Sequence, residues 1–367
     1  MNSNRRVVHI TSVHPALDTR IFVKECSTLA RANWEVKLLV LGAESITRNG
    51  VEIIGVPFSG GRIKRFIRGG RLLIERALEL NAAVYHIHDP ELLFLANQLI
   101  RKGKKVIYDA HEDLPRQVAH KHYIPGWLKG IASRCVEWLE DHYASRMSAI
   151  VSVTPTIVER FGKIHSNVVE VCNYPDFDDI AIDRQRSSSR NICYVGGVTE
   201  ARGIRELLDA LVYTDAKLIL AGACSPSELL EELKTHRAWS KVDYRGFLDR
   251  DGVNQVMRES MVGLVTLRPH PGYSTAYPVK MFEYMAAGLP VLATNIPLWK
   301  AILEEAGAGY TVDINQSQVY GQCIDAFLND PQASLKMGLA GRQAAELRFN
   351  WANESKKLLD LYNRLTQ

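Results

Sequence analysis

The sequence contains no apolar run long enough to cross a membrane. None of its 367 residues lies in an uninterrupted apolar stretch of the roughly 18 to 20 residues that a spanning helix needs. The opening residues 1–6 lead into a short apolar segment that His9 interrupts, so we expect no secretory signal peptide. The six cysteines form no CxxC pair and lack zinc-ligand spacing, which indicates reduced thiols. The sequence therefore predicts a cytoplasmic protein.

Repeats and low-complexity tracts are also lacking, but the charge is unevenly distributed. Residues 1–175 hold 24 Lys and Arg against 17 Asp and Glu, whereas the remainder hold 21 against 24. The excess is greatest at residues 62–76, where six cations are interleaved with apolar side chains. Such a segment is typical either of a contact with an anionic membrane surface or of a solvated helix face. A nucleic-acid site is not favoured, because no aromatic platform or recognised module accompanies the cations.

Short apolar strands and helical segments alternate twice along the chain. The first alternation has expected strands at 7–12, 35–41, 84–88, 105–108 and 149–153. The second has expected strands at 192–194, 217–221, 242–244, 262–267 and 291–293. Between them lies the polar, Ser-rich segment 173–190, which predicts a linker between domains at 1–172 and 191–345. The pattern predicts an α/β fold with two doubly wound parallel sheets, in which ligands bind beyond the carboxyl ends of strands.

The segment 278–291 predicts a helix that binds an anion. Pro278 suits a first helical position and Gly288 suits the residue just past the helix end. Lys280 opposes the helix dipole in the first turn, unless it and the N-terminal amides hold an anion such as a diphosphate. Glu283 shares a face with Lys280 and suits a pair of ribose hydroxyls. An ordinary salt bridge between the two on a solvated face is the alternative.

A glycine pair and an arginine predict a second anion-binding segment. Gly196 and Gly197 follow an expected strand and allow the backbone to approach a phosphate closely. Arg202 lies at the entry to the next expected helix. A glycine pair alone usually marks a tight turn. With Arg202 nearby, an anion site is the better interpretation of these three residues.

Histidines gather near the strand ends of the first domain. His111 follows a buried strand and has carboxylates beside it in the sequence (Asp109, Glu112 and Asp113). His86 and His88 point the same way along another expected strand and precede Asp89. A metal site that includes His111 is an alternative, but we expect none.

Five segments in a fixed order resemble the family 4 glycosyltransferases: 14–22, 108–113, 194–197 with 202–203, 220–222 and 278–291. These are retaining enzymes of the GT-B fold, in which two Rossmann-like domains face each other across a cleft. The first segment is similar to a branch that makes bacterial cell-surface polysaccharides. The resemblance implies that a final helix, at 346–367, returns to the N-terminal domain, which binds the acceptor.

The resemblance also implies roles for individual residues. Arg202 and Lys280 hold the β-phosphate of the donor and act in catalysis together with His111, which lies next to the transferred sugar. Glu283 takes the ribose hydroxyls, while Phe247 and Leu248 line the base pocket. The remaining donor-binding residues are Gly196, Gly197, Ser274 and Thr275. The acceptor side comprises His14, Asp18, Arg20, His111 and Glu112.

Two positions depart from the family pattern. Thr275 stands where many members have a glutamate that contacts the donor sugar, so backbone amides and Ser274 or Thr275 are expected to hold the sugar. Gly197 stands where an arginine is frequent. Both substitutions accompany the 14–22 loop in the bacterial branch, so they do not predict loss of activity.

The expected function is therefore transfer of a sugar from a nucleoside diphosphate donor, UDP or GDP based, to a lipid-linked saccharide. No further cofactor and no metal are expected. A sugar-nucleotide 2-epimerase of the same fold and a non-catalytic partner subunit that binds nucleotide sugar remain as alternatives. The protein is expected in the cytoplasm, with residues 62–76 as a contact to the inner face of the membrane.

Overall fold

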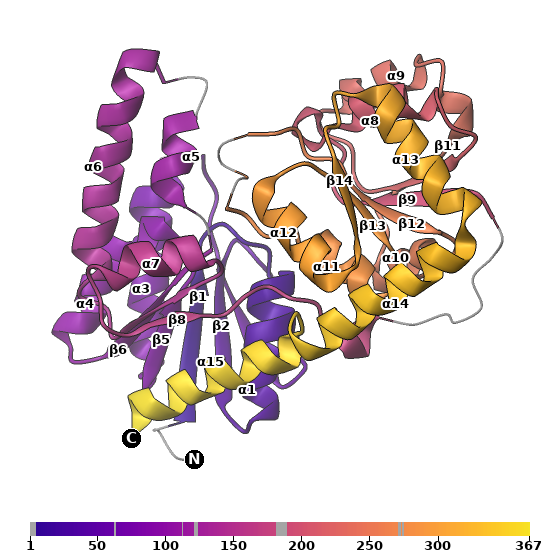
Figure 1. Cartoon of the computed structure of the whole chain (residues 1–367). Helices are drawn as coiled ribbons and strands as arrows, with labels where there is room; N and C mark the ends of the chain where they lie inside the picture. Colours follow the sequence, from indigo (N-terminus) through magenta and orange to yellow (C-terminus); the bar gives the residue numbers. More distant parts are fainter. Residues whose placement is uncertain are drawn as a thin grey trace. The chain divides into compact units, whose positions relative to one another are not determined.

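The protein consists of two compact units, seen in a computed structural model (Figure 1). One unit contains Met1–Asn173 and Trp351–Gln367, and the other contains Tyr174–Asn350. The structure describes residues 5–61, 64–111, 113–120, 124–180, 189–270, 273 and 275–367. Among these residues, no helix has both the length and the apolar character needed to span a bilayer.

The first unit is built on an eight-stranded sheet in the order β3-β4-β2-β1-β5-β6-β7-β8. All neighbouring strands are parallel except the β3–β4 pair, an antiparallel hairpin that the sequence did not predict. The strands are β1 (Arg6–Thr11), β2 (Glu35–Leu41), β3 (Ile46–Arg48), β4 (Val51–Val56), β5 (Val84–Ile87), β6 (Lys105–Ala110), β7 (Ala149–Ser152) and β8 (Val168–Glu170).

Helices cover both faces of this sheet because successive side chains along each strand point to opposite sides. In β1, Val8 and Ile10 join the core with α3, α4 and α7, whereas Val7 joins the core with η2, α1 and α15. The helical elements are η2 (Thr19–Cys26), α1 (Ser27–Arg31), η3 (Arg65–Gly69), α3 (Gly70–Glu79), η4 (Pro90–Leu92), α4 (Leu93–Arg101), α5 (Leu114–His120), α6 (Gly126–Ala144), α7 (Pro155–Gly162) and α15 (Trp351–Thr366).

The second unit has a six-stranded, wholly parallel sheet in the order β11-β10-β9-β12-β13-β14. Its strands are β9 (Asn191–Val195), β10 (Lys217–Ala221), β11 (Val242–Gly246), β12 (Val262–Val265), β13 (Val291–Thr294) and β14 (Gly309–Val312). Its helical elements are η5 (Phe177–Asp179), η6 (Glu200–Arg202), α8 (Ile204–Leu211), α9 (Ser227–Lys234), η7 (Trp239–Lys241), α10 (Arg250–Arg258), α11 (Val279–Ala286), α12 (Pro297–Ala306), α13 (Ser317–Asn329) and α14 (Pro331–Leu347).

The helix α11 is held tightly against two central strands. A side chain at Gly263 in β12 would meet the ring of Tyr284, and the Tyr284 hydroxyl accepts a 2.8 Å hydrogen bond from the Val195 amide at the end of β9. Gly288 ends the helix with a φ of 69°, which confirms its predicted role. Pro278 is the residue before the helix and not its first residue, because its ψ of 107° is extended.

Candidate active site

Lys280 is a buried lysine on the first turn of α11. Its side chain is 8% exposed, and its Nζ has no hydrogen-bond partner among the described residues. The Nζ lies 3.5 Å from the centroid of the Tyr194 ring, and a Cβ at Gly196 would come within 2.9 Å of it. Burial, followed by the charge of Arg202, lowers the pKa of Lys280 well below its usual range. A buried ammonium is unfavourable without an opposite charge nearby, so this position favours binding of an anion.

Arg202 is fixed beside this lysine by the backbone around it. The Thr266 hydroxyl donates a 2.7 Å hydrogen bond to the Arg202 carbonyl. The next residue, Gly203, has a φ of 68°, and a Cβ there would lie 1.9 Å from the Thr266 carbonyl oxygen, so only glycine fits. Within the described residues, neither Arg202 nor Lys280 has a carboxylate at ion-pair distance. The two cations predicted from sequence are thus brought together with no protein anion between them.

Glu283 lies one turn further along α11 and is paired with a residue that the sequence did not single out. Its Oε1 accepts a 2.8 Å hydrogen bond from Arg250, the first residue of α10. Asp249 caps that helix by accepting a hydrogen bond from the Gly252 amide, so α10 begins at Arg250. The simple Lys280–Glu283 salt bridge is therefore not what the structure shows. Arg250 holds the Glu283 carboxylate in place.

The residues predicted for the base pocket follow β11. Phe247 is 82% exposed, an unusual position for a phenyl ring that has no ligand, and Leu248 beside it is half-buried. At the end of the neighbouring strand β10, a Cβ at Gly222 would lie 2.0 Å from the Gly196 carbonyl oxygen. The backbone at Gly222 therefore packs directly against the turn at Gly196. Thr275 is half-buried, while Ser274 lies outside the described residues.

Asp109, at the end of β6 in the first unit, organises the residues predicted for the acceptor side. Arg20 donates to both of its carboxylate oxygens, at 3.0 and 2.9 Å, and also to the Val171 carbonyl. Burial opposes ionisation of Asp109, but Arg20 and His111 outweigh it and hold its pKa well below the usual range. Arg20 is 6% exposed, so its guanidinium anchors Asp109 and is not free for a ligand.

His111 and His14 lie around this carboxylate. The Nδ1 of His111 is 3.2 Å from Oδ2 of Asp109, and its ring makes an edge contact with His14. His14 in turn lies 3.7 Å from Asp18 and 3.5 Å from Asp89. The acceptor-side residues predicted from sequence are therefore neighbours, except Glu112, which lies outside the described residues.

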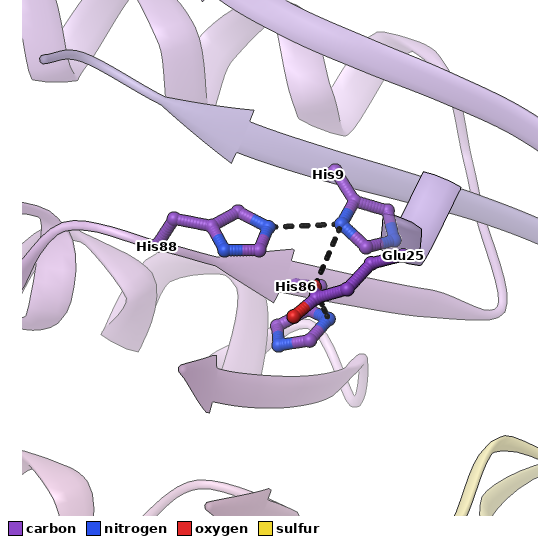
Figure 2. Close-up of side chains that lie close together, drawn as sticks. All are labelled: His9, Glu25, His86 and His88. Atoms are coloured by element: carbon purple, nitrogen blue, oxygen red, sulfur yellow. Dashed lines mark hydrogen bonds and ion pairs between the residues drawn. The ribbon is translucent and has the colours of Figure 1, made fainter. Parts of the chain in front are cut away.

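A group of buried histidines behind His111 has the composition of a metal site. Figure 2 shows His9 from β1, His86 from the adjacent β5, His88 directly after β5 and Glu25 from η2, whose ligand atoms lie within 4.8 Å of one another. His88, Asp109 and His111 form a second such group.

Other contacts already use these donor atoms. His9 Nδ1 lies 2.9 Å from His88 Nε2, and the hydroxyl of Tyr362 bonds to His9 and His86. The guanidinium of Arg20 is 3.1 Å from Glu25. A metal ion here would have to displace these hydrogen bonds and would lie close to a second cation. Sequence reasoning noticed His86 and His88 but missed His9, whose pairing with His86 only strand register reveals.

Comparison with known proteins identifies both units. The profile "Glycosyltransferase Family 4" matches residues 20–173, and "Glycosyl transferases group 1" matches residues 189–330. A phosphatidyl-myo-inositol mannosyltransferase of Mycolicibacterium smegmatis is 24% identical over 93% of this chain and 86% of its own length. The chain spans little more than half, 54 to 59%, of the length of the first curated relatives that it matches.

Solved structures show the fold. A sucrose-phosphate synthase from Thermosynechococcus elongatus superposes with a TM-score of 0.79 at 16% identity, over 98% of this chain and 99% of that one. The Anabaena protein HepE in complex with UDP superposes with a TM-score of 0.76 at 13% identity, over 98% and 100%. The two-domain GT-B fold predicted from the sequence is thereby confirmed.

Proposed function

The chain belongs to the family 4 glycosyltransferases, and on that premise we propose that it is a retaining enzyme that uses a nucleoside diphosphate sugar. The observation that carries this proposal is the unpartnered, buried Lys280 next to Arg202. In glycosyl transfer the departing diphosphate gains negative charge. Fixed cations aimed at it therefore favour the transition state over the ground state.

The proposed donor site uses the second unit. Lys280 and Arg202 hold the β-phosphate, and the turn at Gly196 brings backbone amides close to it. Glu283, oriented by Arg250, accepts from the ribose hydroxyls. The exposed ring of Phe247 stacks on the base. UDP is the first candidate nucleotide because HepE is seen with UDP, and GDP is the second.

The proposed chemistry needs no nucleophile from the protein. The acceptor hydroxyl attacks from the side of the leaving group, a phosphate oxygen takes its proton, and the anomeric configuration is retained. His111 lies on the acceptor side and contacts the sugar. Because two fixed cations neutralise the diphosphate, we also propose that transfer requires no metal ion and no further cofactor.

The proposed acceptor is a lipid-linked saccharide used in bacterial surface polysaccharide synthesis, reached by contact of the first unit with the membrane. Within the 62–76 segment, Phe66 and Ile67 are 44% and 58% exposed, whereas Arg62 and Ile63 lie outside the described residues. Trp127 and Trp138 of α6 are also 76% and 64% exposed. Apolar and cationic side chains exposed together favour an anionic membrane surface.

A titration of thermal stability tests the donor site. UDP, GDP, ADP, CMP and dTDP are each added to the purified protein and to Lys280→Ala, with Lys300→Ala on the exposed face of α12 as the control. At a hundred times its dissociation constant, the true nucleotide adds about 2.7 kcal/mol of stability. We expect one nucleoside diphosphate to stabilise the wild type and Lys300→Ala but not Lys280→Ala.

Turnover separates the proposed transferase from its alternatives. With the corresponding sugar nucleotide and a lipid-linked acceptor, Lys280→Ala and Glu283→Ala are expected to lose transfer while keeping the far-ultraviolet spectrum of the wild type. Epimerisation without an acceptor would instead identify a 2-epimerase. Nucleotide binding without turnover on any acceptor would identify a partner subunit, a result that Thr275 in place of a glutamate makes worth testing.

A further inference from the structure

Two imidazoles and one carboxylate come together where the adjacent strands β5 and β6 end. Ile87, the last residue of β5, pairs with Tyr108 of β6. The next residues of the two strands, His88 and Asp109, are therefore neighbours. His111 follows Asp109 by two positions, a spacing that places side chains on the same side of an extended chain. Strand register thus gathers these three side chains at one edge of the sheet.

Both imidazoles approach the same carboxylate oxygen through the same ring atom. Nδ1 of His88 lies 3.3 Å from Oδ2 of Asp109, and Nδ1 of His111 lies 3.2 Å from it. The two rings are nearly parallel, at an angle of 10°, with centroids 5.6 Å apart. Ligand atoms bound about 2.0 to 2.1 Å from a tetrahedral metal ion lie about 3.3 to 3.4 Å from one another. Both separations are therefore close to those within such a site.

Neither approach to Asp109 is a hydrogen bond. The Nδ1 atoms of His88 and His111 are buried, and neither has a hydrogen-bond partner among the described residues. Each nitrogen is near enough to the oxygen, so its ring does not point directly at it. The ligands of a metal ion share this property, because each points at the ion and not at the next ligand. A buried nitrogen without a partner is unfavourable, and a bound ion would supply the partner.

This group differs from the four-residue group of Figure 2 in the atoms that it leaves available. His88 belongs to both groups, but it contacts His9 through Nε2 and leaves Nδ1 for the second group. With a metal ion on Nδ1, the neutral ring carries its proton on Nε2 and donates it to His9 Nδ1, 2.9 Å away. Metal-bound imidazoles commonly have their second nitrogen hydrogen-bonded in this way. No hydrogen bond of the four-residue group has to be displaced.

Arg20 supports the carboxylate of this group and also limits its affinity. It donates to both oxygens of Asp109, at 3.0 and 2.9 Å. An ionised carboxylate has about four lone pairs, so Oδ2 can accept from Arg20 and still bind an ion. The charge of the guanidinium opposes a second cation, and the buried side chain of Asp89, directly after His88, offsets it in part. We therefore expect reversible binding that a chelator removes.

We propose that His88, Asp109 and His111 form a binding site for a divalent transition-metal ion, with Zn²⁺ as the first candidate. From sequence we expected no metal, and the two unpartnered nitrogens change that expectation for this group alone. Imidazole ligands suit Zn²⁺ and its neighbours in the first transition row, whereas Mg²⁺ prefers oxygen. The side chain of His111 is 17% exposed, so a water molecule completes the coordination from that side.

The bound ion inhibits transfer and is not a cofactor, a consequence that rests on the proposed function. His111 is proposed to contact the sugar on the acceptor side. An ion on its Nδ1 fixes the ring and adds positive charge beside the place where the acceptor binds. Added Zn²⁺ should therefore reduce transfer, and EDTA should restore it.

Absorption spectra of bound Co²⁺ test the site without an assay of activity. Co²⁺ is added to the purified, chelator-treated protein at about pH 8, because ligand nitrogens must be deprotonated to bind. We expect the intense visible bands of four-coordinate Co²⁺, which the hydrated six-coordinate ion lacks. The bands should reach their maximum at one ion per chain and should disappear when Zn²⁺ displaces Co²⁺.

Substitutions show which side chains hold the ion. His111→Gln and Asp109→Asn are each expected to weaken Co²⁺ binding by at least about ten-fold. His86→Gln removes a histidine of the four-residue group alone and should bind Co²⁺ as the wild type does. His236→Gln, in the second unit, is the control for binding at surface histidines. Because His111 is partly exposed, its replacement tests the site even where the buried Asp109 cannot be replaced without unfolding.

The outcomes separate this inference from the proposed function. A wild type that shows only six-coordinate Co²⁺, or binds none, would overturn the site. Loss of binding in His86→Gln but not in His111→Gln would also overturn it, because the ion would then lie in the four-residue group. Loss in His236→Gln alone would indicate adventitious surface binding and reject the site as well. Binding of the expected kind by a protein without transferase activity would confirm the site and refute the function alone.

Discussion

At the scale of single residues, Lys280 shows how a buried side chain without a partner is linked to binding. Its ammonium rests on the Tyr194 ring with Arg202 nearby, and burial lowers its pKa. A diphosphate placed between the two cations would raise that pKa again, since opposite charge favours the ionised lysine. Binding of the donor should therefore be accompanied by uptake of a proton.

Calorimetry in two buffers checks this proton uptake. Between about pH 7 and pH 9, nucleoside diphosphate titrated in buffers of different ionisation enthalpy should give apparent enthalpies that differ, with the sign of proton uptake. The effect should disappear in Lys280→Met, a variant of similar length without a charge. Equal enthalpies in both buffers for the wild type would show that Lys280 is already fully charged before binding.

Single residues of the site differ in how far sequence predicts them. Lys280 and Arg202 were predicted because a cation in a helix first turn and an arginine after a glycine pair are local signals. Arg250 and Tyr194 were not, because their roles depend on which strand ends meet. Tyr362 was missed for the same reason, since it lies 353 positions from His9 in the sequence.

At the scale of elements, Asp18 begins η2, the π-helix that carries Arg20. Its carboxylate accepts from the Arg20 and Ile21 amides at 2.8 and 2.9 Å and lies next to His14. Burial would raise the pKa of Asp18, but His14 and these amides lower it to about 2. A lowered pKa means that the stabilisation is complete above the ordinary pKa of about 4 and is lost as pH falls through about 2.

Replacement of this cap should have an effect that depends on pH. Asp18→Ala is expected to lower the stability of the first unit by about 1 kcal/mol at neutral pH, within the usual range for a cap. The difference from wild type should shrink as pH falls from about 4 toward 2. Urea midpoints along a pH series measure it. Asp18→Asn, which keeps an acceptor oxygen, should lose less, and an equal loss would argue against capping.

The helix α6 exposes an apolar stripe of its own. Trp127, Ile131 and Trp138 lie at helical spacing and are 76%, 59% and 64% exposed, with the exposed Arg134 on the same face. A stripe of this kind does not belong to the core. In the proposed function it rests on the lipid surface next to the acceptor.

Sedimentation with vesicles tests α6. The double variant with Trp127→Ser and Trp138→Ser should bind anionic phosphatidylglycerol vesicles more weakly than the wild type. Arg68→Glu with Arg71→Glu should lose about 1 kcal/mol of binding for each cation removed. Leu347→Ser, at a 67% exposed site in the second unit, should behave as the wild type. Equal binding by all four proteins would show that neither α6 nor the segment with Arg68 and Arg71 contacts the membrane.

Elements were predicted best where local signals agree. Gly288 ended α11 as expected, and the central strands of both sheets were found, whereas β4, β8 and β14 were not predicted. The hairpin β3–β4 was missed because β3 is three residues long and fully exposed, so it has no apolar alternation. A final helix was expected at 346–367. In the structure α14 extends to Leu347 and α15 begins at Trp351, so residues 348–350 lie between the two helices.

At the scale of the whole molecule, the second unit is inserted within the first. Four large apolar side chains of α15 are at most 1% exposed and share the core with β1, β2 and η2: Trp351, Leu358, Leu361 and Tyr362. Burying each contributes about 1.5 to 3 kcal/mol, so together they match the whole stability of an ordinary domain. Sequence patterns show that α15 is amphipathic, but not which sheet it covers.

Deletion of α15 tests this dependence. Residues 1–173 alone are expected to be unfolded or aggregated, whereas the same residues with 351–367 joined by a flexible linker should fold cooperatively. Residues 174–350 alone should fold, because their sheet and core are complete. Circular dichroism and thermal melts provide the measurement. A cooperative melt of residues 1–173 without α15 would show that the helix adds little.

This inserted arrangement also fixes an order during synthesis. A ribosome makes the eight strands of the first unit, then the whole second unit, and only afterwards the helix that closes the first sheet. Until then, one apolar face of that sheet is covered by η2 and α1 but not by α15, and apolar surface exposed in this way is prone to aggregation and attracts chaperones. The hydroxyl of Tyr362 follows with this helix, so its hydrogen bonds to His86 and His9 form only after both units have been translated.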